Sequence, residues 1–242
     1  MDVDRLYVDV VRELERRADV EQARKEMYFH KQVGAGFQCY GISAPEFKEI
    51  AKKFKQAFRE LGFEDRFELA RRFFRSGYGG QMSFGIALLK LNVKDMKPSD
   101  FWVLEDVGDC LNNWGTVDGF CIDVLQPLLL AYPDEVLSIL RRWNRSESLW
   151  KRRASVVVFT RNIGKSGKFT EEALKLCNGL IWDKGGFSAK GRGLGSKRHY
   201  ERRQRESAGI RQGAEAERSL SGNNAVCHTR LERKRSQSSP RH

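Results

Sequence analysis

The chain has 242 residues, of which 40% are hydrophobic, and its mean hydropathy is −0.58 with a formal net charge of +12. This length fits one domain of ordinary size, or one domain followed by a tail. No apolar run reaches the ~18 residues of a membrane span, and residues 1–16 lack the continuous apolar stretch of a secretory signal. We therefore expect a protein that is intracellular, nuclear or cytoplasmic, and not secreted.

The five cysteines are odd in number and widely scattered, and no CxxC pair or Cys/His cluster occurs. This pattern argues against both a disulfide framework and a zinc site, and it favours a reduced compartment. The positive charge suggests a polyanionic partner, but most of it lies late in the chain. Residues 185–242 contain 14 Lys and Arg against 5 Asp and Glu, whereas residues 1–184 contain 30 against 27.

Nearly every segment before Trp182 has the apolar periodicity of an α-helix. Leu6, Val10 and Leu14 recur at helical spacing in the first segment. Ser43-Ala-Pro-Glu46 has the pattern of a capping box with proline in the first turn, and Gly62 is expected to end the helix that follows. The apolar face of that helix consists of Phe47, Ile50, Ala51, Phe54, Phe58 and Leu61.

Further helices follow in regular order. One is predicted from Glu64 to Arg75, with a stop at Ser76-Gly77. Later helix starts are indicated near residues 80, 98, 114, 133, 147 and 170. No convincing β-hairpin is present.

The spacing of these starts predicts an architecture. Starts near 43, 80, 114 and 147 are about 33 to 37 residues apart, and those near 64, 98, 133 and 170 share that interval. Two interleaved series with one period are typical of an all-α superhelix, a solenoid of helix pairs in which one series lines a concave surface. An irregular all-α bundle remains the alternative.

The composition changes after residue 184. Glycines crowd the segment that begins at Gly185, and from Arg198 onward apolar residues are few. Such a segment cannot bury enough apolar surface to offset the loss of chain entropy. We therefore predict a helical-repeat domain at residues 1–184 and a disordered, basic tail at residues 185–242.

Two segments could carry chemistry. Trp114 and Asp118 are four residues apart and therefore project from the same face of a helix. One repeat later, Trp150 and Arg153 occupy the equivalent places. Equivalent positions of stacked repeats lie side by side, roughly 8–10 Å apart, so a carboxylate, an indole and a guanidinium are expected to share one patch.

That combination suits the release of a base alkylated on a ring nitrogen. Such a base is cationic, and breaking its glycosidic bond puts positive charge on the sugar, as in glycosidase transition states. Asp118 can stabilise this charge and orient a water, while the ring face of Trp114 attracts a cation by about 0.5–2 kcal/mol. Arg153 can hold a phosphate bidentately, a role that Arg152 can share or exchange. The reaction needs no metal and no organic cofactor.

Three segments together resemble the signature of the AlkD-like DNA alkylation repair family. They are Tyr40-Gly-Ile-Ser-Ala-Pro-Glu-Phe-Lys-Glu-Ile50, Asn113-Trp-Gly-Thr-Val-Asp118 and Trp150-Lys-Arg-Arg-Ala154. The resemblance covers roughly residues 20–183.

The resemblance implies HEAT-like repeats that cradle double-stranded DNA on a concave basic face. It also implies a DNA glycosylase that excises cationic lesions such as 3-methyladenine and 7-methylguanine without drawing the base into a pocket. By position, Trp114 matches a tryptophan that contacts DNA, Asp118 the catalytic aspartate, and Arg153 an arginine near the DNA backbone. DNA carrying alkylated bases is the expected partner, and the chain is expected to act as a monomer.

The chain departs from the family pattern near its end. The family continues with a helix that carries a further tryptophan, expected near residue 190, where this chain has Ser188-Ala-Lys-Gly-Arg-Gly-Leu194. Trp182 comes too early to be that residue. A C-terminally truncated, inactive glycosylase is therefore one alternative, and a non-catalytic helical-repeat module that binds DNA or protein is another.

The residue assignments also have alternatives. Trp150 is a candidate DNA-binding residue together with Arg153 and Arg152, but it is also a candidate for core packing, because its neighbours are aliphatic. Arg153 could pair with a carboxylate of an adjacent repeat in place of a phosphate.

Overall fold

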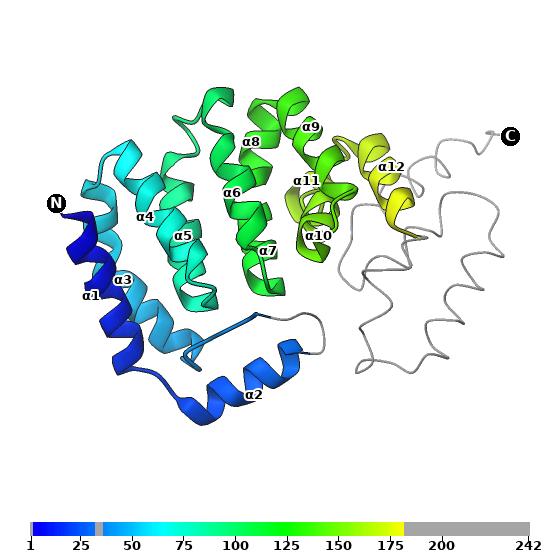
Figure 1. The fold of residues 1–242 in the computed structure, drawn as a ribbon. Helices are drawn as coiled ribbons and strands as arrows, with labels where there is room; N and C mark the ends of the chain where they lie inside the picture. Colours follow the sequence, from blue (N-terminus) through cyan, green and yellow to red (C-terminus); the bar gives the residue numbers. More distant parts are fainter. Residues whose placement is uncertain (1, 32–35, 182–242) are drawn as a thin grey trace, which may run out of the picture. The chain divides into compact units, whose positions relative to one another are not determined.

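The structure is a computed structural model that describes residues 2–31 and 36–181 (Figure 1). Its regular elements are helices, which confirms the all-α prediction, and one isolated bridge joins Gln38 to Tyr78. The predicted tail at 185–242 and Trp182 lie outside the described residues. The first helices are α1 (Val3–Arg16), α2 (Val20–Lys31), α3 (Ala44–Glu60), α4 (Phe63–Arg75), α5 (Gly79–Asn92), η1 (Pro98–Asp100) and α6 (Trp102–Cys110).

The later helices complete the described part of the chain. They are α7 (Trp114–Phe120), η2 (Cys121–Leu125), α8 (Gln126–Ala131), α9 (Pro133–Asn144), α10 (Leu149–Val157), α11 (Arg161–Ser166) and α12 (Thr170–Ile181). None of the described helices combines the length and the apolar content that a membrane span needs.

The predicted periodicity agrees with the observed helix starts. α3, α5 and α7 begin at residues 44, 79 and 114, and α4, η1 and α9 begin at residues 63, 98 and 133. Each predicted start lies within two residues of an observed one. The short helix α11 and the boundaries of α2 were not predicted from the sequence.

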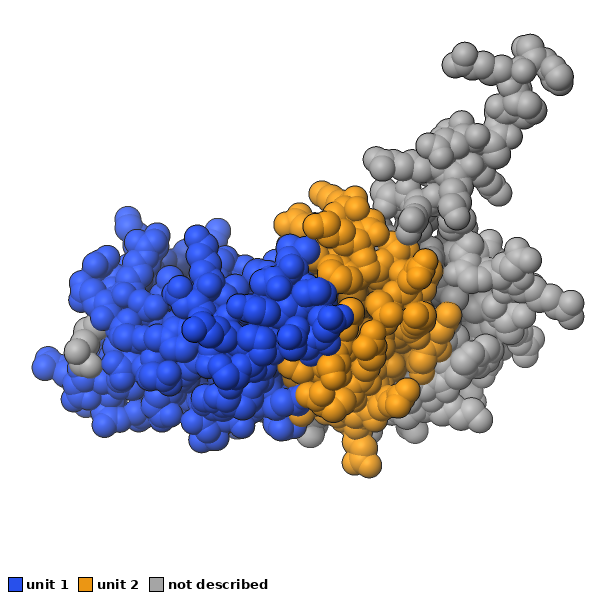
Figure 2. Space-filling view, turned by 90° about the horizontal axis from the view of Figure 1, so that it is seen from above, with its two compact units in different colours: residues 1–136 blue, residues 137–242 orange. Residues whose placement is uncertain are grey.

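The chain divides into two compact units, residues 1–136 and residues 137–242 (Figure 2). Within the first unit, α5 packs against α3 and α7, while α4 packs against α5, α6 and α1. Helices 35 residues apart in sequence (44 to 79, and 79 to 114) are therefore neighbours in space. This is the packing of helix pairs that the interleaved series predict.

Aromatic rings fill the core between these helices. Phe54 and Phe58 of α3 each meet Phe84 of α5 edge to face, with ring centroids 6.4 and 5.6 Å apart. Phe73 of α4 contacts the same Phe84 ring at 6.0 Å. Since edge-to-face pairs add about 0.5–1.5 kcal/mol beyond their burial, this cluster holds three helices of the first unit together.

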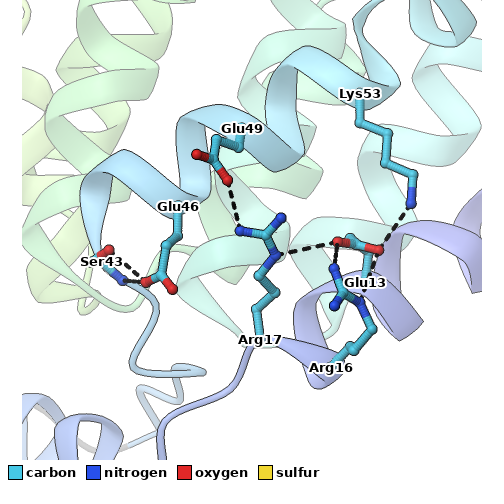
Figure 3. Close-up of polar contacts among 7 residues, drawn as sticks. All are labelled: Glu13, Arg16, Arg17, Ser43, Glu46, Glu49 and Lys53. Atoms are coloured by element: carbon cyan, nitrogen blue, oxygen red, sulfur yellow. Dashed lines mark hydrogen bonds and ion pairs between the residues drawn. The ribbon is translucent and has the colours of Figure 1, made fainter.

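A charge cluster joins α1 to α3 (Figure 3). The carboxylate of Glu13 accepts hydrogen bonds from Arg16 at 2.5 Å and from Lys53 at 2.9 Å, and Arg17 lies 3.4 Å away. Arg17 also donates to Glu49 at 2.8 Å. The bond from Arg16, and then that from Lys53, lowers the pKa of Glu13 from 4.5 to about 2. The cluster therefore couples the ionisation of Glu13 to the contact between the two helices.

The start of α3 follows the predicted capping pattern. Ser43 is the N-cap, and the carboxylate of Glu46 accepts hydrogen bonds from the Ser43 backbone N–H at 3.2 Å and its hydroxyl at 2.5 Å (Figure 3). These bonds lower the pKa of Glu46, the hydroxyl being the larger cause. The local sequence is therefore sufficient to fix this helix start.

The end of α3 differs from the prediction. Gly62 has a φ of −67° and serves as the N-cap of α4, so it is not a left-handed cap of α3. The guanidinium of Arg66 satisfies the terminal carbonyls of α3 instead, donating to Phe58 O at 3.1 Å and to Arg59 O at 2.7 Å. Because a side chain from α4 meets these carbonyls, the chain needs no glycine with positive φ there.

Candidate active site

Trp114 and Asp118 both lie on α7, one turn apart and each partly exposed. The helix starts where the sequence predicts, because Asn113 is an effective N-cap. Asn113 has extended backbone (φ −155°, ψ 163°), and its side-chain oxygen accepts the N–H of Thr116 at 3.0 Å. The carboxylate and the indole expected to act together are thus accessible on one helix of the first unit.

The other side of α7 is buried against α5. Val117 and Phe120 have no exposed surface. A Cβ atom placed on Gly119 would lie 3.3 Å from the Ile86 Cδ1 atom of α5, so glycine allows the two helices to approach closely here. This packing fixes which edge of α7 faces solvent.

A π-helix, η2, follows α7 directly. The Gln126 N–H bonds to the Cys121 carbonyl five residues earlier, which widens the turn. Pro127 has no N–H to offer the Asp123 carbonyl, and its ring would crowd a regular α-helix at that point. The wide turn accommodates the proline, and π turns are frequent at functional sites. Hydrophobic periodicity gave no sign of this element.

A small cavity of about 190 Å³ opens at the start of α7. Burial raises the pKa of the Cys39 thiol in its wall to about 11. The cavity has no signal in the sequence, because its walls come from segments far apart in the chain. They include Glu26, Phe37, Cys39, Tyr40, Phe47, Asn113, Gly115 and Thr116.

The second unit contains the other predicted residues, all on α10. Trp150, Arg152 and Arg153 are only 8%, 9% and 8% exposed. The low exposure of Trp150 agrees with its interpretation as a packing residue. Arg152 donates through Nη1 to the backbone carbonyls of Ser146 at 2.5 Å and Glu147 at 2.8 Å. This side chain therefore stabilises the turn between α9 and α10, a role that the sequence did not indicate.

Arg152 also lines a cleft of about 700 Å³ in the second unit. Arg141 and Lys175 in the same wall pair with Glu172 at 3.1 and 3.2 Å. The bond from Arg141 is the largest cause that holds the pKa of Glu172 below its ordinary value. Glu172 thus offsets part of the positive charge that lines the cleft.

The structure brings together some of the predicted residues. Trp114 and Asp118 share α7 in the first unit, whereas Trp150, Arg152 and Arg153 share α10 in the second. The structure defines each unit by itself, so a single patch that joins the two groups remains a prediction.

Packed helix pairs define the class of the protein as all-α, and one of these helices carries a partly exposed indole and a partly exposed carboxylate as a candidate active site. The model of one family, the DNA alkylation repair enzymes, matches residues 10–194. The chain belongs to this family, and DNA repair is its role. The match extends beyond residues 20–183 at both ends. A comparison with curated proteins gave no match.

Proposed function

We propose that the protein is a DNA glycosylase that removes cationic N-alkylated purines, such as 3-methyladenine and 7-methylguanine, from duplex DNA. Water adds to the sugar carbon, the bond to the base breaks, and the products are the free base and an abasic site. The observation that carries the proposal is the pairing of Trp114 and Asp118 on one accessible face of α7. Membership of the DNA alkylation repair enzyme family supports it.

Asp118 is assigned the central role. As the base departs, positive charge develops on the sugar, and a fixed carboxylate beside it stabilises that charge. The same carboxylate orients the attacking water. Because the alkylated base is already cationic, it leaves as a neutral molecule and needs no general acid. The chemistry requires no metal and no organic cofactor.

Trp114 and the arginines of α10 are assigned to DNA binding. The ring face of Trp114 attracts the cationic base or sugar. Arg153, which is 8% exposed, is assigned the contact with a backbone phosphate. Arg152 can share or exchange this role, and Trp150 is the third candidate for contact with DNA.

The proposal extends to the DNA-binding surface, the oligomeric state and the cellular location of the protein. We propose HEAT-like repeats whose concave face holds the duplex, and a monomer as the active form. We also propose that the protein acts in the nucleus or the cytoplasm.

The decisive experiment measures base release from duplex DNA that contains 7-methylguanine. We expect the wild-type chain to release the base and Asp118→Asn to lower the rate at least about 100-fold, while both bind the duplex equally. Loss of one group that stabilises transition-state charge typically has an effect of this size. Asp123→Asn is the matched control, since this residue lies five positions further on and pairs at the surface with Lys90 at 2.8 Å.

Two outcomes would count against the assignment. Equal rates in wild type and Asp118→Asn would remove Asp118 from the mechanism. Tight binding of damaged duplex without any base release would favour a non-catalytic DNA-binding module, or a truncated and inactive glycosylase, instead.

A further inference from the structure

We propose that Asn112 is a positioning residue, which fixes the start of α7 and so sets where Trp114 and Asp118 stand. This inference rests on the proposed function, because the effect of Asn112 on chemistry is exerted through Asp118. Asn112 itself is not assigned any contact with DNA.

The side-chain amide of Asn112 takes part in three hydrogen bonds, two as donor and one as acceptor. Its Nδ2 donates to the Gly77 carbonyl at 2.9 Å and to the Gly36 carbonyl at 3.2 Å. Its Oδ1 accepts a hydrogen bond from Asn113 Nδ2 at 2.9 Å. Asn113 in turn accepts the Thr116 N–H at 3.0 Å as the N-cap of α7. One amide therefore holds the capping residue of the candidate catalytic helix.

The partners of Asn112 belong to a junction of distant segments. Gly77, between α4 and α5, has a φ of +76°, and its carbonyl also accepts the Gln38 N–H at 3.4 Å. The Gly79 N–H at the start of α5 donates back to the Gln38 carbonyl at 2.8 Å. Asn112 thus ties α7 to the start of α5 and to the segment before α3.

Position matters because both site residues lie within the first five residues of α7, directly after the Asn113 N-cap. Trp114 is its first residue and Asp118 lies one turn on. A tilt or fraying of the first turn displaces both side chains, and a misplacement of about 1 Å in a catalytic group can cost roughly 100-fold in rate. The first unit therefore needs a rigid link at this point.

The chemistry of the link requires an amide. Asparagine offers two donor hydrogens and an acceptor oxygen on one short side chain. Aspartate keeps the acceptor geometry but has no hydrogen to donate when ionised, and its charge would face the carbonyls of Gly77 and Gly36. The substitution Asn112→Asp therefore removes the link while it changes the size of the side chain very little.

The test compares Asn112→Asp with a matched variant, Asn92→Asp. The Asn92 side chain makes similar bonds at the other end of α5, donating to Phe63 O at 2.9 Å and accepting from Arg66 at 3.3 Å. We expect Asn112→Asp to lower the single-turnover rate of 7-methylguanine release 10- to 100-fold, with less than a threefold change in Kd for the duplex. At temperatures below the melting temperature of the variant, Asn92→Asp is expected to release the base at a rate within about twofold of the wild-type rate.

A second measurement does not depend on catalysis. Amide hydrogen exchange of residues 114–120 is expected to quicken at least about tenfold in Asn112→Asp and to stay unchanged in Asn92→Asp. If Asn112→Asp does not fold, Asn112→Ala removes the same bonds without adding a charge.

The outcomes separate this inference from the proposed function. A wild-type chain that releases no base disproves the glycosylase proposal, while exchange in α7 still reports on the anchoring. The positioning role is overturned if exchange in α7 is unchanged, if an active enzyme keeps its rate in Asn112→Asp, or if Asn92→Asp loses as much rate.

Discussion

At the scale of single residues, the ionised side chain of Glu13 stabilises the contact between α1 and α3. Its side chain is only 9% exposed and accepts hydrogen bonds from Arg16 and Lys53. Because these bonds lower its pKa from 4.5 to about 2, Glu13 stabilises the folded state fully above pH 4.5. That stability is lost as the pH falls from 4.5 through about 2.

We therefore predict that Glu13→Gln lowers the free energy of unfolding at pH 7 by about 1–2 kcal/mol. The full pKa shift corresponds to more, but Arg16 and Lys53 are 63% and 59% exposed, so solvent screens their charges. Urea unfolding at pH 7 and at pH values down to 2 measures the effect, and the two curves should converge at the acid end.

A matched control for Glu13 lies on α3. The Glu49 side chain is 67% exposed and pairs with Arg17 at 2.8 Å, so Glu49→Gln should change stability by less than about 0.5 kcal/mol. A constant difference between wild type and Glu13→Gln at every pH would contradict the role given to its ionisation.

At the scale of helices, the contact between α4 and α5 depends on a glycine inside α5. A Cβ atom on Gly85 would lie 2.8 Å from the Phe74 ring and 3.1 Å from the Ala70 carbonyl. Phe74 is only 1% exposed and has little room to move. We predict that Gly85→Ala destabilises the protein by about 1–2 kcal/mol, since overpacking outweighs the ~1 kcal/mol gain in helix propensity. Urea unfolding measures this loss.

The same substitution at Gly80 provides the comparison. There a Cβ atom would find its nearest neighbour, the Tyr40 Cδ2 atom, at an ordinary contact distance of 3.5 Å. Gly80→Ala should therefore be neutral or slightly stabilising. Equal losses at both positions would show that the tight contact at Gly85 is not the cause.

The sequence predicted helix ends well where the capping residue and the group that it bonds are close in the chain. The Ser43–Glu46 pattern and Gly77 mark a helix start and a helix end correctly. Gly62 was misread because the group that satisfies the end of α3 is Arg66, on the next helix. The π-helix η2 escaped notice because apolar spacing describes which face is buried, not how wide a turn is.

At the scale of the whole molecule, the candidate site was predicted only in part. Four-residue spacing is enough to place Trp114 and Asp118 on one face of α7. Spacing cannot reveal that Arg152 turns back to the Ser146 carbonyl, or that Asn112 reaches the carbonyl of Gly36, 76 positions away in sequence. Such contacts depend on the folded chain and leave no local pattern.

Much of the positive charge lies late in the chain. Of the net charge of +12, residues 195–242 contribute 12 Lys and Arg against 5 Asp and Glu, a surplus of seven that lies beyond the family match at residues 10–194. Each phosphate neutralised by a protein cation changes the slope of log K against log salt by about 0.9. We predict that shortening the chain to residues 1–194 makes the slope for binding of undamaged duplex less steep by at least about 1. The rate of base release at saturating DNA should stay the same.

The slope is measured by titrating labelled duplex with protein at salt concentrations between about 50 and 200 mM, a range over which such binding weakens strongly. Arg153→Ala serves as the comparison, because the loss of one phosphate contact should lower the slope by about 0.9 or less. If the shortened chain keeps the full slope and Arg153→Ala does not, the phosphates are bound by the helical part alone, and the basic residues after 194 have no share in holding DNA.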